Sequence, residues 1–142
     1  MIKKALFLAV LSILLPSTVW GADGDKFTAK VDASGNVLDD SSSDGILMTF
    51  RVISESEKTC QVGEAFAKED YTDDMCAVAK TTNSAIVIPS QVKGYSVVKI
   101  GYGAFRGCSI TGVTIPSSVI TIGEYNQEIK GETNVEIIPV IA

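Results

Sequence analysis

The chain contains no histidine, and this single absence excludes several kinds of catalytic and metal site. Ser–His and Cys–His nucleophile pairs cannot form, and the usual nitrogen ligand of zinc is missing. Only three cysteines occur, Cys60, Cys76 and Cys108, and none stands in a CxxC spacing. A thioredoxin-type or cysteine-bound metal site is therefore not expected, and we predict no cofactor and no enzymatic activity.

A surplus of positive charge is also lacking, since 12 Lys and Arg stand against 17 Asp and Glu. Nucleic acid, whose phosphates require a basic face, is therefore not an expected partner. The acidic residues between Asp23 and Asp40, and those between Asp70 and Asp74, do not follow the fixed spacing of a calcium-binding EF-hand loop. We interpret both groups as solvated surface.

Long apolar runs are absent except at the N-terminus, where Ala5 to Leu15 are apolar apart from Ser12. This run is much shorter than the roughly 20 residues that a membrane span needs. Two lysines precede the run, and Val19-Trp-Gly21 follows Pro16. This pattern predicts a signal peptide over residues 1–21, and hence an exported chain that is secreted, periplasmic or at the cell surface, without a transmembrane anchor.

After the leader, the composition predicts three regions. Residues 22–44 are polar and acidic with isolated apolar residues, so we expect a flexible tether, although a short strand around Lys26 to Val31 stays open. Residues 45–83 contain two strand-like segments, Ile46–Ile53 and Thr59–Val62, separated by a polar turn. We expect a β-hairpin that caps the open end of the region that follows.

Residues 84–142 contain a repeat. Ile86-Val-Ile-Pro-Ser90 returns at an offset of 27 as Val113-Thr-Ile-Pro-Ser117. Five residues around Lys93-Gly94-Tyr95 are extra in the first copy, so the basic period is 22, with the extra residues in a hairpin-like bulge. A third strand near Ile137 fits an offset of 22, whereas Pro139 fits an offset of 23. The pattern predicts a stack of two to three short repeats, the last one degenerate.

Between the two copies lies Ile100-Gly-Tyr-Gly-Ala-Phe-Arg-Gly-Cys108, followed by Ser109 to Gly123. Together these segments resemble the repeat of the BspA-like leucine-rich repeat proteins over residues 85–123. The resemblance implies a mainly β fold, a short right-handed leucine-rich-repeat stack of units of about 22–23 residues. It also implies a secreted or surface protein of a host-associated bacterium. Some members of the family act as adhesins.

Few residues stand out as candidate contacts. Val87 and Thr114 occupy outward strand positions of the two repeat copies, and Tyr95 and Tyr102 are aromatics that either anchor an interface or pack in loops. For Cys60 and Cys76 the alternatives are a disulfide, which export permits, or two free thiols. Cys108 lies within the repeat and is interpreted as a small core residue.

The sequence therefore predicts a non-enzymatic protein-interaction or adhesion module. Its partner would be a host or bacterial surface protein, or a glycan. Two alternatives stay open: a truncated structural paralogue without a ligand, and a carbohydrate-binding accessory protein. Nothing in the sequence selects a particular ligand.

Overall fold

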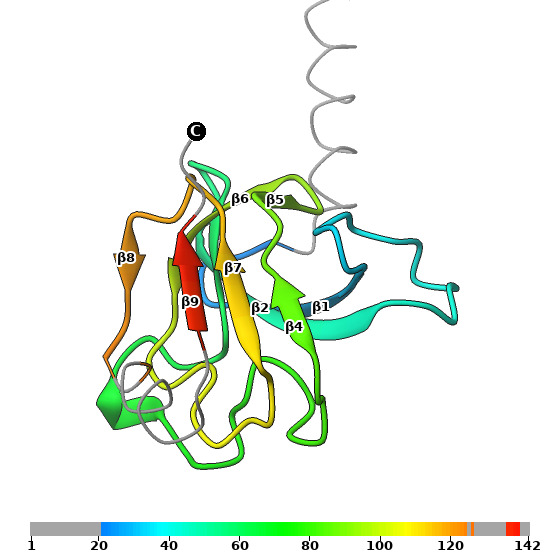
Figure 1. Ribbon diagram of the computed structural model, residues 1–142. Helices are drawn as coiled ribbons and strands as arrows, with labels where there is room; N and C mark the ends of the chain where they lie inside the picture. Colours follow the sequence, from blue (N-terminus) through cyan, green and yellow to red (C-terminus); the bar gives the residue numbers. More distant parts are fainter. Residues whose placement is uncertain (1–20, 125, 127–135, 140–142) are drawn as a thin grey trace, which may run out of the picture.

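The computed structural model describes residues 21–124, 126 and 136–139, and this part of the chain consists mainly of strands with almost no helix (Figure 1). The predicted β class is therefore correct. Residues 1–20 of the expected leader and residues 127–135 of the expected last repeat lie outside the described residues. The strands, with one short 3-10 turn, are β1 (Lys26–Val31), β2 (Ile46–Ser54), β3 (Thr59–Val62), η2 (Lys68–Asp70), β4 (Ala85–Val87), β5 (Gln91–Val92), β6 (Tyr95–Ile100), β7 (Gly112–Ile115), β8 (Thr121–Ile122) and β9 (Glu136–Pro139).

Within the expected tether over residues 22–44, the short strand that stayed open around Lys26 to Val31 is present as β1, which pairs antiparallel with residues 46–51 of β2, so these six residues are not a tether. The physical reason is the alternation of Phe27, Ala29 and Val31, which places these side chains on one face of the strand. Ala29 and Val31 are buried, and the Phe27 ring stacks on Phe50 with 5.5 Å between ring centroids. Isolated apolar residues at a spacing of two thus suffice for a strand when a partner strand is present.

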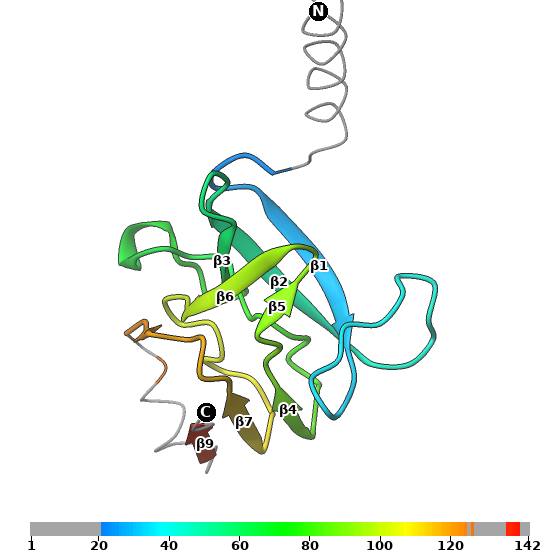
Figure 2. The same cartoon turned by 90° about the horizontal axis from the view of Figure 1, so that it is seen from above.

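Strand β3 has two neighbours, and only one of them was expected. It forms the predicted antiparallel pair with β2, in which Phe50 lies opposite Val62. Its other edge pairs in parallel with β6, with Val62 beside Ile100. The segment 59–62 is therefore also the first of three parallel strands, β3, β6 and β8, in one sheet (Figure 2).

The spacing of the two repeat copies is explained by a hairpin. Strands β6 and β8 pair with Ile100 beside Ile122, which is the predicted offset of 22. Strands β4 and β7 pair with Ile86 beside Val113, at the offset of 27. The five extra residues lie in the β5–β6 hairpin. Its two turn residues, Lys93 and Gly94, both have positive φ, 49° and 90°. Positive φ at both central positions is the geometry of a type I′ turn, so the predicted bulge is correct.

The register of the third strand differs from both predictions. Val113 lies beside Ile137 and Ile115 beside Pro139, an offset of 24 rather than 22 or 23. Strands β4, β7 and β9 form a separate parallel sheet, and they stand side by side in Figure 1. The offset of 24 differs from 22 by two residues and so leaves the same side chains on each face of β9, whereas an offset of 23 would exchange the two faces.

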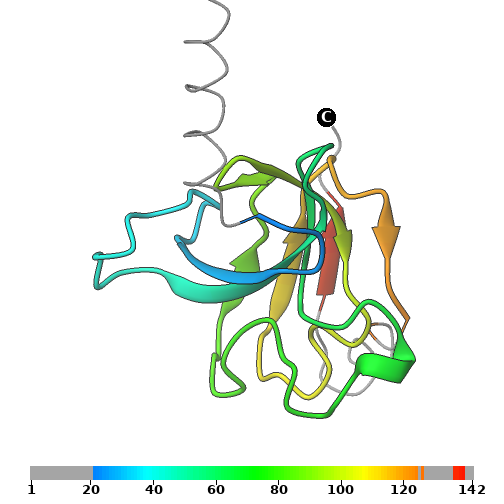
Figure 3. The same ribbon diagram turned by 180° about the vertical axis from the view of Figure 1, so that it is seen from behind.

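One hydrophobic core joins the two sheets. In Figure 3 the blue and cyan strands β1 and β2 lie in front of the green, yellow and red strands of the β4 sheet. The core contains Ile86 and Val113 from the β4 sheet together with Val97 and Ile100 from the β3 sheet. Phe105, in the turn that follows β6, is only 4% exposed and packs into the same core, as predicted.

The tight helical turn expected around Phe105 takes a simpler form. Residues 104–106 form hydrogen-bonded turns and no assigned helix. The amide of Arg106 donates to the carbonyl of Gly103 at 3.1 Å, which is enough to aim the Phe105 ring at the core.

Candidate functional site

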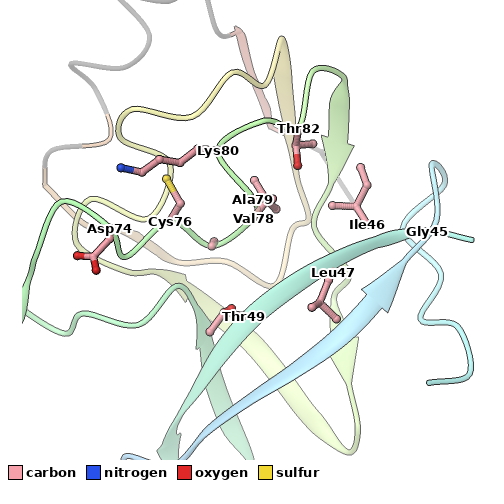
Figure 4. Close-up of a pocket in the computed structure, with 11 residues that line it drawn as sticks. Gly45, Ile46, Leu47, Thr49, Asp74, Cys76, Val78, Ala79, Lys80 and Thr82 are labelled. Carbon is pink, nitrogen blue, oxygen red and sulfur yellow. The ribbon is translucent and has the colours of Figure 1, made fainter. Parts of the chain in front are cut away.

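An open groove of about 660 Å³ runs between the N-terminal half of β2 and the segment 74–82 (Figure 4). We call it the β2 groove. Figure 4 shows side chains from both walls directed into the same space. Its lining residues are Gly45, Ile46, Leu47 and Thr49 on the strand side, and Asp74, Cys76, Ala77, Val78, Ala79, Lys80 and Thr82 on the loop side.

The groove exists because β3 is shorter than β2. Strand β3 pairs only with the C-terminal half of β2, from Phe50 onward. At Thr49 the carbonyl accepts the amide of Gly63 and the amide donates to the carbonyl of Ala77, each at 2.8 Å. The segment 74–82 thus touches β2 at one residue and then diverges from it. Before Thr49, this edge of β2 has no neighbouring strand among the described residues.

Leu47 therefore presents its backbone to the groove. Residues two apart in a strand direct their backbone groups to the same side, so the amide and carbonyl of Leu47 point the same way as those of Thr49. Strand β1 supports this orientation of the Leu47 backbone. Lys30 lies across from Leu47, and its carbonyl accepts the amide of Leu38 instead of a β2 amide. The result is one unpaired donor and one unpaired acceptor at a strand edge, as far as the described chain extends.

The side chains of the groove are mixed in character. Leu47 is 52% exposed, which is unusual for a large aliphatic side chain, while Ala77 and Val78 are buried in the wall. Asp74 and Lys80 supply one charge of each sign. The hydroxyl of Thr72 donates to the Asp74 carboxylate at 2.7 Å and lowers the pKa of that group, so Asp74 is anionic at neutral pH.

Other acidic residues stabilise turns or form ion pairs. Asp32 accepts the amides of Ser34 and Asn36, and the hydrogen bonds from Asn36 hold the pKa of its carboxyl below the ordinary value. Asp40 forms an ion pair with Lys93 at 3.2 Å. Among the described residues, no group of three or more His, Cys, Asp or Glu side chains is arranged to hold a metal ion.

Two of the predicted contact residues lie together, and two are buried. Val87 and Thr114 are neighbours in the β4–β7 pair and both are partly exposed. Tyr95 and Tyr102 are only 7% and 8% exposed, so both rings are enclosed, which favours packing over the alternative of aromatic anchors. Tyr102 packs edge-on against Tyr71, with 5.4 Å between ring centroids, in the wall of a second hollow of about 560 Å³ near β8.

Tyr95 instead belongs to the core. Its hydroxyl donates to Glu55 at 2.6 Å, and its ring contacts Phe27 with 5.5 Å between centroids. Burial, together with the Glu55 carboxylate, raises the pKa of Tyr95 to about 12. The hydroxyl hydrogen bond allows the polar end of the ring to be enclosed, which the sequence did not indicate because Glu55 is 40 residues away.

Of the two alternatives for Cys60 and Cys76, the structure has free thiols, and Cys108 is a free thiol as well. Cys60 is enclosed within β3, and burial raises the pKa of its thiol to about 12. Cys76 lies in the wall of the β2 groove, and its Sγ and that of Cys108 both approach the carbonyl oxygen of Arg106. Sequence reasoning missed this pair because the path of segment 64–83 depends on tertiary contacts.

Fold and groove together define a mainly β protein with an open, partly apolar groove beside an unpaired strand edge. Comparison with protein-family models, with curated proteins and with solved structures finds no match for this chain. The resemblance of residues 85–123 to BspA-like repeats therefore stays a prediction. Within the described residues no helix is long and apolar enough to cross a membrane.

Proposed function

We propose that this chain is an exported, non-enzymatic protein-interaction module, and that the β2 groove accepts an extended segment of a partner polypeptide. The observation that carries the proposal is the unpaired backbone of Leu47 at the edge of β2. An extended peptide that lies along such an edge gains main-chain hydrogen bonds, and pockets for its side chains add selectivity.

The side chains of the groove fit the same partner. The exposed Leu47 side chain offers apolar area, worth roughly 25 cal/mol per Å² when it is covered. Asp74 and Lys80 offer opposite charges in the loop-side wall, so they set the direction of a bound segment more than its affinity. A volume of about 660 Å³ is in the range of sites that hold a short segment and not a whole domain.

We further propose that the parallel strands are a short right-handed stack of BspA-like leucine-rich repeats, with the β2–β3 hairpin as N-terminal cap. The offset of 22 between Ile100 and Ile122 supports it, as does the parallel pairing in both rows. An adhesive role toward a host or bacterial surface protein follows from that resemblance. On this view the repeats hold the groove in place, and the groove makes the contact.

A library of linear peptides displayed on phage tests the proposal, with the full chain immobilised as bait. We expect enriched peptides that compete with one another for one site. Replacing alternate amides of an enriched peptide by N-methyl amides should weaken binding at least tenfold, because an added strand needs those donors. A peptide that binds equally well after N-methylation at every position would contradict strand addition.

A matched pair of variants locates the site. Leu47→Lys changes an exposed apolar residue in the groove, and Ile120→Lys changes a residue that is 83% exposed and outside the groove. Binding should be lost in the first and retained in the second. Saturable binding on a glycan array, with no peptide enrichment, would favour the carbohydrate-binding alternative instead.

A further inference from the structure

Two thiols that are far apart in sequence, Cys76 and Cys108, meet at the wall of the β2 groove. Both sulfurs approach one carbonyl, and the interaction between the two thiols shifts their pKa values in opposite directions. The Sγ atoms of Cys76 and Cys108 lie 3.1 Å and 4.0 Å from the carbonyl oxygen of Arg106. The two sulfurs are therefore immediate neighbours inside a folded chain.

Backbone hydrogen bonds hold the two segments together on both sides of this pair. The amide of Ala77, directly after Cys76, donates to the carbonyl of Ala104 at 2.7 Å. The amide of Ser109, directly after Cys108, donates to the carbonyl of Lys80 at 3.3 Å. These two bonds tie the segments that carry Cys76 and Cys108 to each other, so the folded chain holds the two side chains close together.

The two thiols differ in access and acidity. Cys76 is partly exposed in the groove, whereas Cys108 is only 2% exposed. The hydrogen bond from Cys108, with a smaller contribution from Lys80, lowers the pKa of Cys76. The same hydrogen bond and burial raise the pKa of Cys108. An accessible thiol of lowered pKa beside an enclosed one is the arrangement of an attacking and a resolving cysteine.

We propose that Cys76 and Cys108 form a dithiol site that closes to a disulfide by exchange with a small-molecule or protein disulfide of the export compartment. The Cys76 thiolate attacks one sulfur of the oxidant, forming a mixed disulfide and releasing the first thiolate. Cys108, as its thiolate, then attacks Sγ of Cys76 and releases the second. Two cysteine thiols lose two protons and two electrons, and the oxidant's disulfide is reduced to two thiols.

The bond would tie the loop-side wall of the groove to the turn after β6. It closes a loop that runs from Cys76 to Cys108 and contains β4, β5 and β6, so it restricts the unfolded chain as well as the groove wall. The site does not depend on what the groove binds. A negative peptide experiment would leave the dithiol proposal standing, and a failure to form the disulfide would leave the peptide-binding proposal standing.

The test is redox equilibration of the full chain. The protein is reduced, freed of reductant, incubated with oxidised and reduced glutathione, quenched in acid, alkylated in denaturant and digested with trypsin. Lys68, Lys80 and Arg106 place the three cysteines in three different tryptic peptides. We expect a Cys76–Cys108 linked pair that is lighter than the two free peptides by two hydrogens, while Cys60 is alkylated.

Two variants separate the roles of the thiols. Cys108→Ser should arrest the reaction at a mixed disulfide between glutathione and Cys76, whereas Cys76→Ser should leave Cys108 reduced. Cys60→Ser serves as the matched control and should retain the linked pair. In the wild-type chain, reduction should lower Tm by on the order of 10 °C, and this drop should vanish in Cys76→Ser. Alkylation of both Cys76 and Cys108 under oxidising glutathione, or a Cys60–Cys76 link, would overturn the proposal.

Discussion

At the scale of single residues, burial decides the chemistry of Tyr95. The ring is enclosed between Phe27 and the Lys58 side chain, with the ammonium of Lys58 5.3 Å from the ring centroid. The hydroxyl donates a hydrogen bond to the Glu55 carboxylate. Loss of the hydroxyl proton would therefore place two negative oxygens 2.6 Å apart. The folded state therefore favours the neutral phenol more strongly than water does.

This preference predicts a loss of stability at high pH. The pKa of Tyr95 rises from its ordinary value of 10.0 to about 12 on folding. Between these values the unfolded chain has released the proton and the folded chain has kept it, so rising pH favours unfolding. The contribution is fully present below pH 10 and falls by about 1.4 kcal/mol per pH unit above it. Urea unfolding at about pH 8 and about pH 11 measures this difference.

Tyr95→Phe is the informative variant, because it keeps the ring and removes the proton. It should be about 1 kcal/mol less stable at the lower pH, where the bond to Glu55 is lost, and should show a smaller drop at the higher pH. Cys60 contributes a drop of the same sign, since burial raises its thiol pKa from 9.0 to about 12. The comparison is therefore made in a Cys60→Ala background. An equal pH dependence with and without the Tyr95 hydroxyl would refute the assignment.

Residue positions along the sequence did not reveal these environments. Tyr95 and Tyr102 follow turn-forming glycines and read as loop aromatics, but their rings are enclosed by residues distant in sequence, Phe27 for one and Tyr71 for the other. The environment of the cysteines was hidden for the same reason. Sequence spacing offered Cys60 as a partner of Cys76, whereas the tertiary fold brings Cys108 to Cys76 and buries Cys60 in a strand.

At the scale of elements, the glycines that end β3, β6 and β8 permit the close approach of the parallel strands. The amide of Gly101 donates to the carbonyl of Val62 at 2.8 Å, and the amide of Gly123 donates to that of Ile100 at 2.7 Å. The buried side chain of Asn126 reinforces the last step by donating to the carbonyls of Gly101 and Gly123. Each turn thus lies directly against the backbone of its neighbour.

Gly123→Ala tests this packing. A Cβ at Gly123 would lie 2.8 Å from the amide nitrogen of Tyr102 and 2.9 Å from the carbonyl oxygen of Ile100. Both are backbone atoms that cannot rotate away, so we expect a loss of about 1–3 kcal/mol in the free energy of unfolding. The amide of Ile120, which donates to Val98 at 2.9 Å, should also lose protection from hydrogen exchange as β8 separates from β6.

Gly107→Ala is the control for this variant. Gly107 has φ of 73° but no atom within 4 Å of an added Cβ, so its substitution costs backbone strain without a collision. It should leave the protection of Ile120 unchanged. Retained protection of Ile120 in Gly123→Ala would show that the β8 pairing does not depend on this contact.

Much of the arrangement of strands and turns was predictable from sequence, because the local sequence pattern determines it. Repetition of Ile-Pro-Ser and Ile-Gly indicated the offset of 22 and the inserted hairpin, since turn chemistry at Lys93-Gly94 is local. The parallel partner of β3 was not predictable, because Val62 and Ile100 are far apart in sequence and no common motif links residues 59–62 to residues 95–100. The register of β9 depends on where residues 136–139 meet β7, which no local signal fixes.

At the scale of the whole molecule, both sheets contribute to one hydrophobic core. Phe50 from β2, Val97 from β6, Ile86 from β4 and Val113 from β7 belong to the same cluster of buried side chains. Removing either sheet would expose the apolar face of the other. Ala77 and Val78 of the segment 74–82 belong to this core, so the loop-side wall of the groove is anchored in it.

A shared core predicts that the full chain unfolds in a single cooperative transition. Far-ultraviolet circular dichroism follows the strands, and near-ultraviolet circular dichroism follows the packed tyrosines. The two signals should change together with urea, and their midpoints should agree. A broad, non-cooperative loss of structure would instead favour the alternative of a truncated paralogue that folds poorly and binds nothing. If the chain unfolds cooperatively but no peptide binds it, the fold is supported and the proposed interaction is not. The unfolding experiment and the peptide selection therefore test separate claims.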